Sequence, residues 1–280
     1  MSARERVDCQ IHIWKADRPQ RPWPDRGWDG RPPRPHRDMP LEPGEVLSTM
    51  ERAQVHRAVL IPPSWEGYYN DAVLAAARRW PKQFAAMGRW APGTPLESLR
   101  AWRDIPGMLG IRLIIPPDGV FAKADVGHPF WRAAEDAGIP LMVHAVGNNA
   151  LVARIADRHP DLRMALDHMG TGLMGPDLDE FMYEDDVLAL ASRRNVAVKL
   201  SAVPCHSRRL GRPWSDMTPR IKRLIDAFGP ERCFWGSDLS RLPCDYTELV
   251  DYFEEDLDWL SEKDLDLIMG QAVLKWLDWR

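Results

Sequence analysis

Four side chains that can move protons or bind metal ions each follow a short apolar run of the sequence: His12, His144, His168 and Asp238. Imidazole exchanges protons near neutral pH and binds metals through nitrogen, and a carboxylate beside it can take a proton from water. One histidine after an apolar run is commonly just a hydrogen-bonded core or helix-capping residue. Four residues placed alike are hard to explain in that way. The pattern therefore predicts one catalytic site, with Asp238 as its general base.

The apolar runs are part of a regular alternation of short β-rich segments with longer helical patterns, which is typical of βα units and a parallel sheet. We expect strands at 7–14, 57–63, 84–90, 107–115, 140–145, 163–169, 196–202 and 233–238. Helical patterns lie at 44–55, 70–80, 95–102, 129–138, 149–159, 185–194, 218–229 and 247–260, and a last one at 261–279 is expected to pack across the outer layer. Eight units of each kind close a barrel. We predict an α/β fold, a single (β/α)8 TIM barrel spanning residues 1–280.

Two motifs of rival folds are absent. An open doubly wound sheet is the alternative to a barrel, but no GxGxxG follows an early strand and no GxxxxGK[ST] phosphate loop occurs. The GxSxG motif of serine hydrolases is also absent, which argues against a serine nucleophile.

Polar residues at the C-terminal ends of barrel strands converge on one crevice, because the loops meet there while apolar side chains fill the rest of the interior. Gln10 shares one face of the first strand with the histidine two positions later. Arg112 and Lys199 fall in the fourth and seventh strands, where an inward cation is costly unless an anion meets it. We favour a substrate carboxylate as the partner of Arg112, whereas Lys199 could equally pair with a protein carboxylate. Ser201, on the same face as Lys199, is a further candidate for substrate binding.

The loop after the second strand carries Trp65, Tyr68, Tyr69 and Asn70. These side chains could stack on a flat ring and hydrogen-bond its substituents, although ordinary loop packing would explain them equally well. Polar residues that follow other strands, expected to line the site and to be solvated, are Arg89, His206 and Arg241.

Residues 17–42, after the first strand, are rich in Pro, Arg and Trp and are too broken by Pro for a core element. A long loop at that position of a barrel overhangs the active face, so a role in covering substrate or contacting another subunit competes with plain disorder. The chain has 13 Trp, several of which are expected in loops or pockets, where they could offer a homo-oligomer its contact surface.

Several of these motifs together resemble the amidohydrolase superfamily. They are His12 with Trp14 after the first strand, GIRL around Arg112, VKLS around Lys199, the histidines of the fifth and sixth strands, and FGPERCFWGSD at the eighth. The most similar branch is the amidohydrolase-related group, which holds pyrone-dicarboxylate lactonase, sugar-acid lactonases and relatives of aminocarboxymuconate-semialdehyde decarboxylase. The resemblance covers nearly the whole chain.

The resemblance implies a metal site with one departure. The family begins its metal site with HxH, but this chain has Gln10-Ile11-His12, which replaces an imidazole by a neutral amide. His12, His144 and Asp238, with Gln10, could still hold one zinc-like divalent ion. A metal-free site is the alternative, since the branch contains both kinds of member, and Gln10 could instead orient His12 by a hydrogen bond.

The function we predict is hydrolysis of a small carboxylated cyclic substrate, most simply a lactone C–O bond. Asp238 would activate water, while His144 and His168 would polarise the carbonyl and hold the oxyanion. Non-oxidative decarboxylation of an aromatic or muconate-like acid is the first alternative, because Gln10 is nearly isosteric with the Glu that such relatives often carry. A catalytically silent ligand-binding barrel is the second, prompted by the altered HxH.

Composition narrows the partners and the location. Hydrophobic residues make up 45% of the chain and charged residues 28%, as in globular proteins with a sizeable core. The net charge of −4 and the scattered arginines argue against nucleic acid as a partner. No signal-peptide core and no apolar run of membrane-spanning length are present, so we expect a cytoplasmic protein without membrane contact. Four widely separated cysteines are expected to be free thiols.

Overall fold

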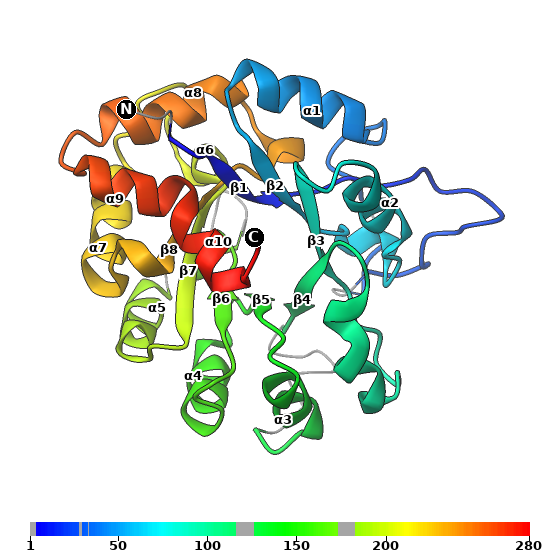
Figure 1. The fold of residues 1–280 in the computed structure, drawn as a ribbon. Helices are drawn as coiled ribbons and strands as arrows, with labels where there is room; N and C mark the ends of the chain where they lie inside the picture. The colour runs from blue at the N-terminus through cyan, green and yellow to red at the C-terminus, as the bar shows by residue number, and fades with distance from the viewer. Residues whose placement is uncertain (1–3, 28–29, 33, 116–125, 173–182) are drawn as a thin grey trace.

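The computed structural model describes residues 4–27, 30–32, 34–115, 126–172 and 183–280, and these form the predicted barrel (Figure 1). Every strand pairs in parallel with the next one in the chain. At the remaining seam, between β8 and β1, the main-chain N–H of Asp238 donates to the carbonyl oxygen of Gln10 at 2.9 Å. The strands are β1 (Val7–Ile11), β2 (Arg57–Leu60), β3 (Phe84–Gly88), β4 (Met108–Ile114), β5 (Leu141–His144), β6 (Met164–Leu166), β7 (Val196–Ser201) and β8 (Cys233–Gly236).

Helices surround the strands (Figure 1). The α-helices are α1 (Pro43–Arg52), α2 (Asp71–Arg79), α3 (Pro129–Asp136), α4 (Asn149–Arg158), α5 (Glu184–Ala189), α6 (Val203–His206), α7 (Thr218–Phe228), α8 (Tyr246–Asp251), α9 (Glu262–Asp266) and α10 (Ala272–Leu277). A 3-10 helix, Leu96–Asp104, takes the place of the helical pattern expected at 95–102. Along the part of the chain that the structure covers, no helix is long and apolar enough to cross a membrane.

The strands alternate between two apolar layers, and β7 shows how this positions the site. Val196, Val198 and Leu200 join the large core between the sheet and the helices, whereas Ala197 joins a second cluster inside the barrel. Lys199 and Ser201 continue the inward row of Ala197. All six residues are buried, which is why a strand covered on both faces reads as an apolar run.

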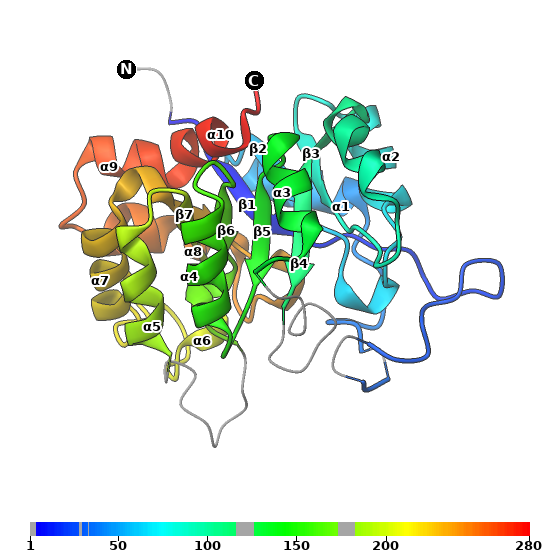
Figure 2. The same ribbon diagram turned by 90° about the horizontal axis from the view of Figure 1, so that it is seen from below.

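The last helix closes the floor of the barrel. Ala272, Val273 and Leu277 pack with the inward-facing Val7 and Phe234. In Figure 2, α10 lies at one end of the barrel and α6 lies at the other. The expectation that this segment packs across the outer layer is therefore wrong for α10: its apolar face covers the inner residues at the N-terminal ends of the strands, which would otherwise meet water.

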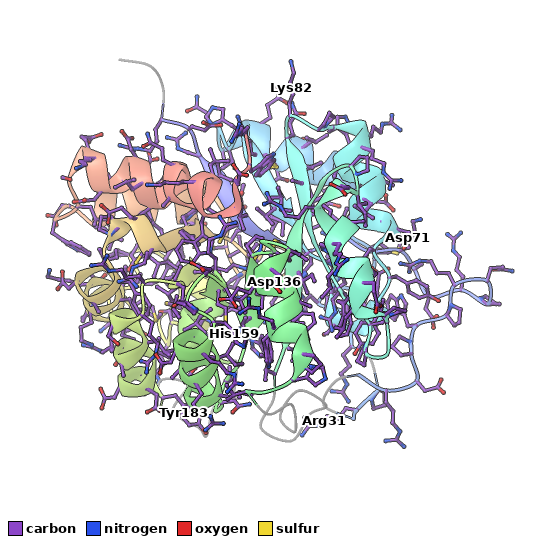
Figure 3. All side chains as sticks on the ribbon, turned by 60° about the horizontal axis from the view of Figure 1, so that its bottom comes forward. Arg31, Asp71, Lys82, Asp136, His159 and Tyr183 are labelled. Atoms are coloured by element: carbon purple, nitrogen blue, oxygen red, sulfur yellow. The ribbon has the colours of Figure 1, made fainter. Side chains whose placement is uncertain are left out.

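The loop after β1 is anchored at the opposite end of the barrel. Figure 3 shows Arg31, from this loop, at the end remote from Lys82, which precedes β3. Arg21 bonds to the buried Glu66 at 2.6 Å and to Asp71 at 2.6 Å, so ion pairs hold the described part of the loop beside α2.

The four cysteines form no disulfide bond, as predicted.

Candidate active site

Asp167, at the end of β6, joins two cations inside the barrel mouth. Arg112 Nε donates to its Oδ2 at 3.0 Å, and Lys199 Nζ donates to its Oδ1 at 2.8 Å. Burial opposes ionisation of this carboxyl, but Lys199 and Arg112 hold its pKa well below the usual range. Lys199 thus pairs with a protein carboxylate, while the Nη groups of Arg112 make no hydrogen bond within the described chain.

A second chain of contacts runs from Lys199 to His12. Lys199 Nζ donates to Gln10 Oε1, which leaves the Gln10 amide nitrogen to donate to His12 Nε2 at 3.1 Å. His12 Nδ1 donates to the carbonyl oxygen of Ile61 at 2.8 Å. Burial and the nearby Arg112 lower the pKa of His12 to about 3, so this imidazole is neutral with its proton on Nδ1. The geometry is the one expected if Gln10 orients His12.

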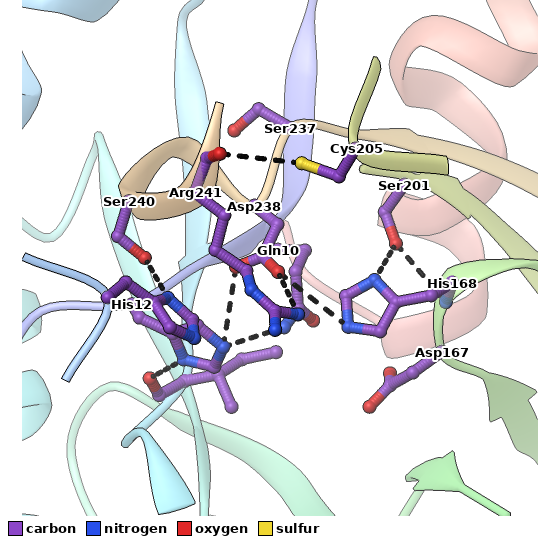
Figure 4. A network of polar contacts seen from close by, with 12 residues as sticks. Gln10, His12, Asp167, His168, Ser201, Cys205, Ser237, Asp238, Ser240 and Arg241 are labelled. Carbon is purple, nitrogen blue, oxygen red and sulfur yellow. Dashed lines mark hydrogen bonds and ion pairs between the residues drawn. The ribbon is translucent and has the colours of Figure 1, made fainter. Parts of the chain in front are cut away.

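Asp238 follows β8 in the left-handed region, at φ 55°, and its side chain is fully buried. Neither carboxylate oxygen accepts a hydrogen bond from a described residue. Three nitrogens face it at longer range: His12 Nε2 at 3.5 Å, His168 Nε2 at 3.8 Å and Arg241 Nη1 at 3.6 Å (Figure 4). An unsatisfied buried acceptor costs about 1–3 kcal/mol, and more if charged, so these oxygens are placed to receive a proton donor such as water.

His168 is turned toward Asp238 by its own backbone and by Ser201. Its φ of 50° is left-handed, and its main-chain N–H donates to Ser201 Oγ at 3.3 Å. The serine hydroxyl can then donate to Nδ1 at 2.9 Å, which places the imidazole proton on Nε2, the nitrogen that faces Asp238. Burial lowers the pKa of His168 well below its ordinary value, and burial together with Arg112 lowers that of His144 to about 3. The rings of these two neutral histidines lie 6.1 Å apart.

The rim of the site is built by loop residues. Trp65 is buried, and its ring centroid lies 4.5 Å from that of His36 and 5.1 Å from that of Trp14. This ring, which we expected to stack on substrate, therefore packs against protein residues. His36 Nδ1 also bonds to Ser240 Oγ at 2.8 Å, which links the loop after β1 to the loop after β8 (Figure 4). Tyr68 is exposed.

The family model described as amidohydrolase matches residues 7–278. The chain belongs to the amidohydrolase family. It is therefore an enzyme of the family that the sequence motifs resemble, and the recognition from sequence is confirmed.

Known proteins similar to this amidohydrolase include a lactonase and two hydrolases of known structure. An L-fucono-1,5-lactonase from Burkholderia ambifaria is 26% identical over 85% of this chain and 81% of its own length. A probable 2-pyrone-4,6-dicarboxylic acid hydrolase from Acinetobacter baumannii, with citric acid bound, has a TM-score of 0.76 at 16% identity over 98% of this chain and 100% of its own. An amidohydrolase from Burkholderia multivorans with bound zinc has a TM-score of 0.74 at 19% identity over 98% of this chain and 99% of its own. The two structures share the fold of this amidohydrolase.

The donors in the site of this amidohydrolase fit a divalent ion in part. His144, Asp167 and His168 offer ligand atoms within 4.8 Å of one another, and His12 Nε2 lies 3.5 Å from Asp238 Oδ1, close to the roughly 3.3 Å between ligands in a tetrahedral zinc site. Gln10 Oε1, however, already accepts from Lys199. Of the predicted ligands, His144 belongs to the first group, and Asp238 Oδ2 lies 3.8 Å from His168 Nε2. His12 Nε2 already accepts from Gln10.

Sequence reasoning missed or misplaced four residues of the site. Asp167 lies two residues after the inward-facing Ala165, so strand alternation alone could have found it, but the adjacent His168 attracted attention instead. Arg89 was expected to be solvated and is 7% exposed; it too continues an inward row, from Ala85 and Met87. Nothing in the sequence marks His36 as a residue of the site, apart from its place in the long loop. His206, expected to be solvated, is buried with its ring 6.3 Å from that of His168.

Proposed function

We propose that this amidohydrolase hydrolyses the C–O bond of a small carboxylated cyclic ester, with Asp238 as general base. The observation that carries the proposal is the buried Asp238 carboxylate, whose oxygens accept no hydrogen bond from a described residue and face His12, His168 and Arg241 at 3.5–3.8 Å. The names of the similar lactonase and pyrone-dicarboxylic acid hydrolase support a lactone as substrate.

Each step can be assigned to a group of this chain. Asp238 takes a proton from water, and the water oxygen attacks the ester carbonyl carbon. His168 Nε2–H donates to the oxyanion that forms, beside His144. The C–O bond to the ring oxygen then breaks, and protonated Asp238 returns its proton to that oxygen, which leaves a hydroxy acid. The free Nη groups of Arg112 bind the substrate carboxylate.

A divalent ion held by His144, His168 and Asp238 would lower the pKa of a bound water and polarise the carbonyl. The neutral state of His144 and His168 suits either imidazole ligation or hydrogen-bond donation.

Decarboxylation has weaker support from the site. That alternative relied on Gln10 as a near-isostere of Glu, but Gln10 uses its amide N–H to donate to His12, which a carboxylate could not do. Its product, carbon dioxide, is easily separated from those of hydrolysis.

The test is Asp238→Asn assayed on sugar 1,4- and 1,5-lactones and pyrone carboxylates, with proton release and carbon dioxide both recorded. We expect hydrolysis by the wild type and a loss of kcat of about 10²–10⁴-fold in the variant, the usual range for a general base. The surface change Asp226→Asn is the matched control, since Asp226 only pairs with Lys222 on α7. Undiminished hydrolysis by Asp238→Asn, or carbon dioxide as the product, would refute the proposal.

A further inference from the structure

Arg89 is a buried cation that no described residue pairs with an anion. It follows β3, its residue is 7% exposed, and its Nε and Nη1 are buried without a hydrogen bond from the described residues. Its guanidinium carbon lies 5.7 Å from the ring centroid of Tyr68. Burial and the nearby Arg112 lower the pKa of Arg89 to about 9.

The position of Arg89 is fixed by its neighbour. Its main-chain N–H donates to Asn70 Oδ1 at 2.7 Å, and Asn70 Nδ2 donates back to its carbonyl oxygen at 3.0 Å. Because Ala85 and Met87 face the barrel interior, alternation along β3 directs the Arg89 side chain to the same side. The guanidinium is therefore held at the mouth of the barrel rather than left free to reach water.

The other buried cations in the described chain are treated differently. Lys199 and Arg112 share Asp167. An isolated buried charge is costly, and proteins normally pair it. Because no described residue supplies an anion to Arg89, a bound anionic ligand is the partner that we consider.

The charges of the described residues at the mouth agree with this. The cations are Arg89, Arg112, Lys199 and Arg241, and the carboxylates are Asp167 and Asp238. Among these described residues the cations outnumber the carboxylates, which favours an anionic ligand.

We propose that Arg89 binds a second carboxylate of the substrate, distinct from the one held by Arg112, so that the substrate is a small dicarboxylate. The identity of this ligand as a substrate rests on the proposed function, but its binding does not. The guanidinium donates its buried N–H groups to the carboxylate oxygens, as arginine does in planar carboxylate recognition.

The experiment measures binding without turnover. Oxalate, malonate, succinate and glutarate are titrated calorimetrically into wild type, Arg89→Met and Arg89→Lys, each beside the monocarboxylate of equal carbon number. We expect at least one dicarboxylate to bind the wild type 10-fold or more tightly than its monocarboxylate. Arg89→Met should reduce that preference to within 2-fold and leave monocarboxylate affinity unchanged, and Arg89→Lys should retain part of it. The control is Arg132→Met, which removes a surface arginine.

A second measurement separates binding from a structural role. Because Arg89 is an uncompensated buried charge, Arg89→Met should unfold at the same temperature as ligand-free wild type or higher, whereas an arginine needed for folding would give a lower Tm. A preference for dicarboxylates that persists in Arg89→Met, or no preference in the wild type, would overturn the inference. Should Arg89→Met fail to fold, that outcome also counts against it, and Arg89→Gln repeats the binding test.

The two proposals can fail separately. An Arg89-dependent preference for dicarboxylates without lactone hydrolysis would refute the proposed function alone. Hydrolysis of lactones with no effect of Arg89 on anion binding would refute this inference alone.

Discussion

Lys199 donates to the side-chain oxygen of Gln10, and this bond turns the Gln10 amide nitrogen toward His12. A fixed positive charge thus lies beside Gln10, the residue that stands where the resembled family has its first metal-binding histidine. Through Gln10, the same ammonium that neutralises Asp167 also sets which nitrogen of His12 carries the proton.

Gln10→Glu should disturb this arrangement with little change of shape. The carboxylate can still accept from Lys199 but cannot donate to His12 Nε2, so His12 must bind a proton or lose its partner. A protonated His12 would pair with Asp238 and weaken it as a base. We expect kcat to fall by about 10²-fold, the low end for loss of a general base. Steady-state kinetics and the imidazole nitrogen shifts of His12 measure the effect, with the exposed Gln20→Glu as control; equal kcat values for wild type and Gln10→Glu would contradict it.

Gln10→His should restore imidazole ligation at the first strand. An imidazole nitrogen is a better zinc donor than a neutral amide oxygen, and it would join His12 and Asp238, which already lie 3.5 Å apart. We expect zinc affinity at least about 10-fold above that of the wild type, in line with the 10–100-fold effects known around metal sites. Competition with a chromophoric chelator, after removal of bound metal, gives both dissociation constants. Identical constants would show that Gln10 does not limit metal binding.

His36 should make stability depend on pH. Burial lowers its pKa to about 3, against about 6.5 in an unfolded chain, so the unfolded state binds the proton first as the pH falls. The contribution of His36 is present above pH 6.5 and is lost progressively from there toward pH 3, by up to about 1.4 kcal/mol per pH unit. Urea unfolding of wild type and His36→Asn between pH 7 and pH 5 tests this. The variant should lose less stability over that interval, and parallel curves would exclude the effect.

Asp8 should hold the seam between β8 and β1. Its Oδ1 accepts from the main-chain N–H groups of Gln10 and Ser237, and its Oδ2 accepts from the hydroxyls of Ser237 and Tyr246. Burial raises its pKa to about 6 although these donors oppose the rise. Asp8→Asn replaces one acceptor by an amide donor that meets donors, so we expect a loss of about 2–4 kcal/mol in unfolding free energy. Tyr246→Phe, which removes one donor, should lower the free energy of unfolding by about 1 kcal/mol. Denaturant unfolding measures both variants. An Asp8→Asn variant with the same free energy of unfolding as wild type would show that the seam does not need the carboxylate.

Local pattern was sufficient for the barrel but not for the whole site. All eight strands begin within a residue or two of their predicted starts, because strands covered on both faces are apolar runs between turn residues. His12, His144 and Asp238 were singled out because each ends or follows such a run, and Lys199 because it is a cation inside one.

Strand alternation could have found Asp167, but His36 and the burial of Arg89 depend on partners far away in the chain. His36 and Ser240 meet across 204 positions, and nothing local marks either residue. Whether Arg89 is solvated or buried depends on Tyr68 and Asn70 from another loop. The prediction that the last helix packs across the outer layer was wrong for α10. An apolar helix face is equally consistent with packing in that layer and with covering the floor of the barrel.

The floor made by α10 bears on the order of synthesis. Residues 272–277 are translated after all eight strands, and until they dock, Val7 and Phe234 stay open to water from below. A growing chain can therefore pair its strands on the ribosome. It cannot exclude water from the inside of the barrel until the residues of α10 have been translated. Ribosome stalling or proteolysis near residue 270 would release a barrel with an open apolar end, the kind of species that chaperones bind.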